Sequence, residues 1–114
     1  MKKLILILLL LVSLGLRAQF LNVKIRNFSG PNEPSICINP KNTNEMMAGS
    51  NLNFWYYSED GGYTWLSGVL SSPEYGVWGD PVIIADTAGD FYLLHLSNPA
   101  VGNWIDRIVC QKFN

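Results

Sequence analysis

The stretch that decides the fold runs from residue 58 to residue 65 and reads Ser58-Glu59-Asp60-Gly61-Gly62-Tyr63-Thr64-Trp65. An aspartate followed by two glycines is turn chemistry, because the carboxylate accepts hydrogen bonds from nearby backbone N–H groups and glycine tolerates a positive φ. Apolar or aromatic runs flank the stretch at residues 54–58 and 64–70. The stretch therefore predicts a tight hairpin, tied by Ser58 and Thr64 and covered by the Trp65 ring.

Short apolar or alternating runs continue through the rest of the chain, and none of them has a helical period. Turn residues, mainly Gly, Pro, Asn and Asp, separate one run from the next. We therefore expect an all-β fold, with strands at residues 23–28, 35–39, 45–50, 54–58, 64–70, 81–86, 91–96 and 105–113.

An internal repeat divides these strands into two groups. An acidic residue and a proline, Glu33-Pro34, lead the strand at 35–39, and Asp80-Pro81 lead another apolar strand 47 residues later. A polar turn, a second strand and a third strand follow in each group. Such a period is typical of the four-stranded blade of a β-propeller, which takes roughly 40 to 50 residues.

The motif and the repeat together resemble the sialidase-like family of BNR-repeat, or Asp-box, β-propellers. The chain matches the Asp-box pattern S-x-D-x-G-x-T-W at all five defining positions, which are Ser58, Asp60, Gly62, Thr64 and Trp65. In that family the box is structural and lies on the outer rim, so the resemblance assigns Asp60 no catalytic role. Calcium binding by Asp60 is disfavoured as well, because the run lacks the spaced carboxylates of an EF-hand loop.

The resemblance implies an incomplete β-propeller of about two four-stranded antiparallel blades within residues 19–114. Blade 1 is expected at about 30–73 and an incomplete blade 2 at about 78–114, where the second copy stops at the end of its third strand. The remaining propeller blades of the ring are then missing from this polypeptide.

The same resemblance places a pocket at the beginnings of the first strands. Sialidases carry an arginine of an R-I-P motif there, the first of three that clamp the carboxylate of the sugar. This chain has Asn32-Glu33-Pro34, with Asn32 in place of the arginine. Only Arg26 and Arg107 remain beyond residue 18, so we expect no sialidase activity from this polypeptide alone.

Two acids and one tryptophan are the candidate site residues. Glu33 and Asp80 hold equivalent places in neighbouring repeats, and two carboxylates that face one pocket are what glycoside hydrolysis requires. The alternative is that each acid caps its strand, as a structural feature of the repeat. Trp78, two residues before Asp80, is a candidate for ligand contact because it lies near the mouth of the expected pocket.

Other chemically distinctive residues have structural interpretations. Trp55 and Tyr57 share one face of their strand, which suits packing between adjacent blades. His95, the only histidine, lacks a nucleophile motif and fits a partly buried strand position. Cys37 and Cys110 lie in apolar runs, where they are free thiols or a disulfide. Neither has metal-ligand spacing, so we expect no metal site and no cofactor.

The first residues read as a secretory signal. Two lysines precede an apolar run at residues 4–16, and Arg17-Ala18-Gln19 follow it. The run of 13 residues is shorter than the roughly 20 that a transmembrane helix needs. We therefore expect a signal peptide at residues 1–18, cleaved after Ala18, and a secreted protein, extracellular or periplasmic, without a membrane anchor.

Charge and resemblance together narrow the function classes. After cleavage five basic and nine acidic residues remain, which argues against a nucleic-acid partner. The resemblance implies a sialidase-like, glycan-related propeller protein whose partner is a glycan or a cell-surface polysaccharide. Two alternatives stay open: a non-catalytic extracellular module that binds protein or polysaccharide, and a truncated reading frame without a function of its own.

Overall fold

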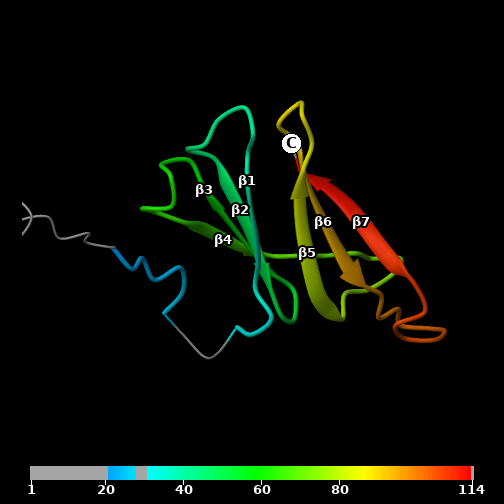
Figure 1. The fold of residues 1–114 in the computed structure, drawn as a ribbon. Helices are drawn as coiled ribbons and strands as arrows, with labels where there is room; N and C mark the ends of the chain where they lie inside the picture. Colours follow the sequence, from blue (N-terminus) through cyan, green and yellow to red (C-terminus); the bar gives the residue numbers. More distant parts are fainter. Residues whose placement is uncertain (1–20, 28–30, 114) are drawn as a thin grey trace, which may run out of the picture.

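The computed structural model describes residues 21–27 and 31–113, and every helix or strand assigned within them is a β-strand. Sheet A contains β1 (Ser35–Ile38), β2 (Met46–Ser50), β3 (Phe54–Ser58) and β4 (Leu66–Val69). Sheet B contains β5 (Gly79–Ala85), β6 (Phe91–Leu96) and β7 (Ile108–Phe113). Each sheet is an antiparallel meander in chain order (Figure 1). The prediction of an all-β fold is confirmed, and these seven strands begin and end within three residues of their expected bounds.

The two sheets pack against each other, with β5 lying on β1 and β2. The core between them joins Met47 of sheet A, 1 % exposed, to apolar side chains of sheet B, namely Ile83, Phe91 and Leu93. Farther from β5, the Trp55 and Phe113 rings meet edge to face at 6.0 Å, and Tyr57 meets Phe91 in the same way at 6.2 Å. The prediction that Trp55 and Tyr57 pack on one face of their strand is therefore confirmed.

Residues 58–65 form the turn between β3 and β4. The Gly62 N–H donates to Ser58 Oγ at 2.9 Å, and Gly62 has a φ of 90°. Thr64 donates twice to the Asp60 carboxylate, from its backbone N–H at 2.8 Å and from its hydroxyl at 2.6 Å. The Trp65 ring N–H donates to the Gly62 carbonyl at 2.8 Å. Because the bonds from Thr64 favour the ionised carboxylate, they hold the pKa of Asp60 at about 2.

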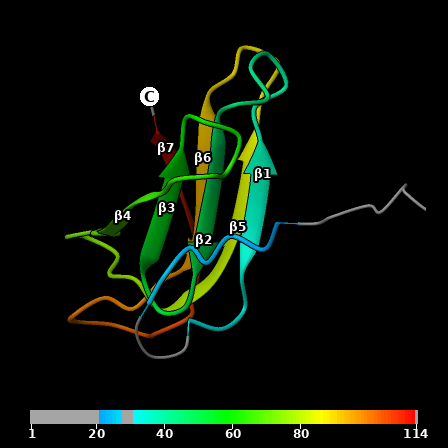
Figure 2. The ribbon, with the colours of Figure 1, turned by 90° about the vertical axis from the view of Figure 1, so that its left-hand side faces the viewer.

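The expected strand at residues 23–28 is the one wrong strand prediction. Within the described part, residues 21–27 form no strand, and Figure 2 shows this segment in blue, crossing the strands of sheet A. The Arg26 guanidinium lies 3.5 Å from the centre of the Phe54 ring and donates to the Tyr56 hydroxyl at 3.2 Å. The alternation of apolar and polar residues in this segment therefore reflects contact of its side chains with a sheet face. In that position its backbone does not lie beside a strand with which it could pair.

The repeat is visible in the first hairpin of each sheet. The Lys41 N–H donates to the Asn39 side chain at 2.9 Å, and 47 residues later the Ala88 N–H donates to the Asp86 side chain at 2.8 Å. The backbone bond that closes the loop spans six residues in sheet A but only four in sheet B. The period of 47 residues therefore relates β1 to β5. β6 comes two residues earlier than this period predicts from β2, and an offset of two residues keeps each side chain on the same face of its sheet.

Both cysteines are free thiols in this fold. Cys37 is half-buried beside the core, and Cys110 is exposed on β7. The predicted signal peptide at residues 1–18 lies outside the described residues. Within the described part of the chain, no helix is long and apolar enough to cross a lipid bilayer.

Candidate functional site

The two candidate acids lie at the same end of the two sheets. β1 and β5 run side by side from that end, with Glu33 two residues before β1 and Asp80 second in β5 (Figure 1). Each acid precedes a proline, and each has an unusual positive φ, 52° at Glu33 and 50° at Asp80. The pairing of β5 with β6 is irregular between Gly79 and Val82, so Asp80 lies in a bulge that redirects its side chain.

Asn51, in the turn between β2 and β3, joins the two acids. Its side-chain amide donates to a carboxylate oxygen of Glu33 and, at 3.5 Å, to Oδ1 of Asp80. Its carbonyl oxygen accepts the backbone N–H of Asp80 at 2.6 Å. Gly79 makes room for this bridge, because a Cβ there would lie 2.1 Å from the Asn51 Oδ1. The structure therefore brings Glu33 and Asp80 together around one amide.

The closeness of the two carboxyl groups alters the protonation of Glu33. A side-chain hydrogen bond with Asp80, followed by the negative charge of Asp80, raises the pKa of Glu33 above its usual value. The amide of Asn51 acts in the opposite direction, because it stabilises the ionised form. Glu33 therefore keeps its proton to a higher pH than an isolated glutamate would.

Trp78, the third candidate, belongs to an aromatic pair near the start of β5. Its ring meets the ring of Trp104 edge to face, with centroids 4.8 Å apart, and the two residues are 38 % and 59 % exposed. Trp104 lies in the loop between β6 and β7, at the sheet end where β5 begins. Two exposed indole rings at the same end as two carboxylates are typical of a surface that binds sugars, whose rings stack on aromatic faces while their hydroxyls donate to carboxylates.

The two arginines beyond the predicted signal peptide have structural contacts. Arg26 lies across β3, as described above, and Arg107 donates to the Asp106 carboxylate from Nε at 2.9 Å and from Nη2 at 2.6 Å. Asp106 also accepts the Ser97 hydroxyl at 2.8 Å. These bonds, those from Arg107 first, lower the pKa of Asp106 to about 2. Arg107 therefore orders the loop that precedes β7.

His95 is more deeply buried than its sequence context suggests, at 2 % exposure. Its Nε2 lies 3.1 Å from the side-chain nitrogen of Gln111, and its Nδ1 lies 2.9 Å from the Leu96 carbonyl. An amide nitrogen only donates, so Nε2 is the acceptor and Nδ1 carries the proton. His95 therefore links β6 to β7 inside the core.

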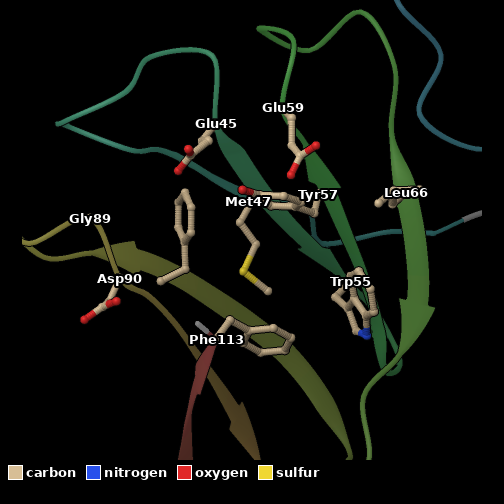
Figure 3. Close-up of a pocket in the computed structure, with 10 residues that line it drawn as sticks. Glu45, Met47, Trp55, Tyr57, Glu59, Leu66, Gly89, Asp90 and Phe113 are labelled. Carbon is tan, nitrogen blue, oxygen red and sulfur yellow. The ribbon is translucent and has the colours of Figure 1, made fainter.

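A hollow of about 460 Å³ opens between the outer strands of the two sheets. Figure 3 shows its apolar walls, with Met47, Trp55, Tyr57 and Phe113 around the space and Glu45 and Glu59 at the upper rim. Burial, and then the negative charges of Glu45 and Glu59, raise the pKa of Tyr57. Glu45 already accepts hydrogen bonds from two asparagine side chains. Glu45, Glu59 and Asp90 supply the carboxylates of this hollow, and its other lining side chains are mainly apolar.

Asn51 and Trp104 are the site residues that sequence reasoning missed. Asn51 had no reliable signal, because Ser50-Asn51 recurs 47 residues later as Ser97-Asn98, but the offset of two residues between β2 and β6 means that these are not equivalent positions. Trp104 had none, since it lies in a loop with no counterpart in the first repeat. Among the described residues, no group of three or more His, Cys, Asp or Glu side chains is placed to hold a metal ion.

Comparison of the chain with models of protein families, with curated proteins and with solved structures found no match.

Proposed function

We propose that this chain is an exported, sialidase-like Asp-box propeller protein that binds a glycan and does not cleave it. The observation that carries the proposal is the convergence of Glu33 and Asp80, from equivalent places in two repeats, on the side chain of Asn51. Exposed Trp78 and Trp104 at the same end of the sheets supply apolar surface for a sugar ring. Carboxylates accept hydrogen bonds from sugar hydroxyls. Ligand sites commonly combine apolar surface with a few such polar groups.

The spacing of the acids favours binding over hydrolysis. Glycosidases hold their two carboxyl groups about 5 Å apart or more, to leave room for the anomeric carbon or for water. Here one side-chain nitrogen of Asn51 donates to both the Glu33 and the Asp80 carboxyl groups, so it occupies the space between them. Two carboxylates also repel a third, so a neutral or amino sugar suits this site better than a sialic acid.

The hairpin between β3 and β4 supports the propeller part of the proposal. Its side-chain hydrogen bonds run among the five residues that define the Asp box, and they give Ser58, Asp60 and Thr64 a structural role. Two successive antiparallel sheets packed through their first strands fit neighbouring blades of such a ring. Export is proposed from the signal-like first 18 residues.

A glycan array tests this function on the secreted product of the whole reading frame, expressed with its own leader. We expect binding to neutral or amino-sugar glycans, and at least a tenfold loss of affinity in the Asn51→Ala and Asp80→Asn variants. Glu59→Gln is the matched control, because Glu59 is an exposed acid at the opposite end of β3. It should bind like the wild type.

Activity assays complete the test. A fluorogenic sialoside and a panel of neutral aryl glycosides should show no turnover. Two results would contradict the proposal: an array without binding above background, or glycan binding that Asn51→Ala leaves unchanged. Turnover of any of these substrates that depends on Glu33 would replace binding with catalysis.

A further inference from the structure

The first strand of each sheet is apolar on both of its faces. β1 reads Ser-Ile-Cys-Ile, and β5 contains the run Pro-Val-Ile-Ile-Ala. In a sheet with one solvated face, apolar and polar residues alternate, whereas a strand covered on both faces is apolar throughout. One face of β5 is buried against sheet A, but Val82 and Ile84 on the other face are 50 % and 48 % exposed. The sequence is therefore suited to a second neighbour that these strands do not have within the described chain.

The contact between the two sheets shows what such a neighbour looks like. We call the side of sheet A that faces sheet B its front face, and the side of sheet B that faces sheet A its back face. The front face of sheet A carries Cys37 and Met47, and the back face of sheet B carries Ile83, Ala85 and Leu93. The Ile83 N–H also donates to Ser35 Oγ at 2.9 Å across this contact. The chain therefore contains one complete front-to-back interface.

The repeat places the two halves of the same interface on the outside of the molecule. Forty-seven residues after Ser35 and Cys37, the front face of sheet B carries Val82 and Ile84. Forty-seven residues before Ile83 and Ala85, the back face of sheet A carries isoleucines 36 and 38, which are 57 % and 47 % exposed. An exposed front face and an exposed back face thus lie on opposite sides of the sheet pair.

We propose that the front face of sheet B docks on the back face of sheet A in a second copy of this chain. The proposed contact repeats the one between the two sheets of a single chain. Each exposed face is the repeat counterpart of a face that is buried in that internal contact. It is heterologous, and contacts of this kind close into rings when the rotation per step allows it. Propellers have four to eight blades, so a ring of chains with two blades each contains two to four copies.

The segment at residues 21–27 lies over β2 and β3 on the back face of sheet A, where Ala48 and Tyr56 are buried, and leaves β1 open for this contact. Arg26 lies over Phe54 and Tyr56 of β3, on the back face of sheet A. In the internal interface, β5 lies mainly on the two inner strands of its neighbour. Ile36 and Ile38 belong to the innermost strand, β1, and both remain about half exposed beside this segment. The proposal depends on the repeat and not on glycan binding, so the two can fail separately.

Sedimentation velocity and light scattering test the proposal on the secreted full chain over a range of concentrations. We expect oligomers of two to four copies for the wild type. Ile84→Lys blocks the front face and Ile36→Lys blocks the back face, so each variant should be monomeric by itself. Val101→Lys is the matched control, because Val101 is 90 % exposed in the loop between β6 and β7. It should assemble like the wild type.

A mixture of the two variants distinguishes this contact from other ways of associating. The intact back face of Ile84→Lys fits the intact front face of Ile36→Lys, so an equimolar mixture should form a heterodimer. Association of Ile36→Lys with itself would overturn the proposal, because it requires a symmetric contact between two front faces. A monomeric wild type at 100 µM, roughly the upper end of such assays, or a mixture that stays monomeric, would also overturn it.

Circular dichroism shows whether each variant keeps the β-sheet signal of the wild type. If Ile84→Lys or Ile36→Lys fails to fold, Val82→Lys and Ile38→Lys replace them on the same two faces, with the same expected outcomes. These positions are 50 % and 47 % exposed, so a lysine there keeps its charge in water when the protein is monomeric.

Discussion

Replacing Ser58 by alanine should destabilise the fold through the turn between β3 and β4. The Ser58 hydroxyl donates to Asp60 Oδ1 at 2.9 Å and accepts the Gly62 N–H at 2.9 Å. Ser58 is only 1 % exposed, so water does not easily take the place of the missing hydroxyl. The variant therefore removes these two hydrogen bonds and a longer one from the Asp60 N–H at 3.4 Å, and it leaves the Gly62 N–H without its partner.

The size of the effect follows from these two bonds. Each contributes about 1 kcal/mol net, and an unsatisfied buried donor costs about 1–3 kcal/mol, so we expect a loss of about 2 kcal/mol. For a domain of this length, that loss corresponds to a melting temperature roughly 10 °C lower. Ser67→Ala, on the exposed side of β4, is the matched control and should change stability by less than about 0.5 kcal/mol.

Urea denaturation followed by tryptophan fluorescence measures both variants at one low protein concentration. The midpoint should fall for Ser58→Ala while the slope stays constant, because the surface exposed on unfolding is unchanged. If Ser58→Ala and Ser67→Ala have the same midpoint, the hydroxyl of Ser58 does not hold the turn. The structural account of the turn at residues 58–65 would then be refuted.

Three further predictions concern charge and backbone geometry. Because the pKa of Asp60 is lowered from 3.8 to about 2 in the folded state, its stabilising effect is complete above pH 4 and lost as the pH falls towards 2; urea midpoints of Asp60→Asn should lack this dependence. The pKa of Glu33 is raised, so its ionisation opposes folding as the pH rises; Glu33→Gln should melt above the wild type at pH 7 but not at pH 4. Gly79→Ala should lower the free energy of unfolding by about 1–3 kcal/mol, because Gly79 has a φ of 137° and a Cβ there would clash with Asn51, and it should also abolish glycan binding. Gly102→Ala is the control, since Gly102 has a φ of 115° but a Cβ there would have no contact closer than 3.9 Å, and this variant should keep glycan binding.

The strands and the turn at residues 58–65 were predictable because the interactions that form them are local. Within this turn, no side-chain hydrogen bond spans more than four residues. The hairpin arms are specified by alternation and by turn residues, which act over the same short range. The predicted strand at residues 23–28 shows the limit of this reasoning. Alternation of apolar and polar residues indicates that one side of a segment is buried, but not that another strand lies beside it to pair with.

Register and burial were less accessible to sequence reasoning. The loop between β5 and β6 is shorter than its counterpart in sheet A, so an unbroken period of 47 residues misaligns β2 with β6. His95 is fully buried because Gln111 of β7 satisfies its second ring nitrogen, a contact between residues 16 apart. Such long-range partners leave no periodic signal in the chain.

By itself, the sequence determined the all-β class, the positions of the strands and the turn chemistry, since each depends on neighbours a few residues away. Only the tertiary structure decided that Glu33 and Asp80 meet at Asn51, because packing of β5 on β1 brings together side chains 18 and 29 residues from that amide. Packing also decided which apolar face of each first strand is covered. Both faces of these strands are apolar in the sequence. Only the structure shows which face the neighbouring sheet covers and which face stays exposed, where we propose that another copy docks.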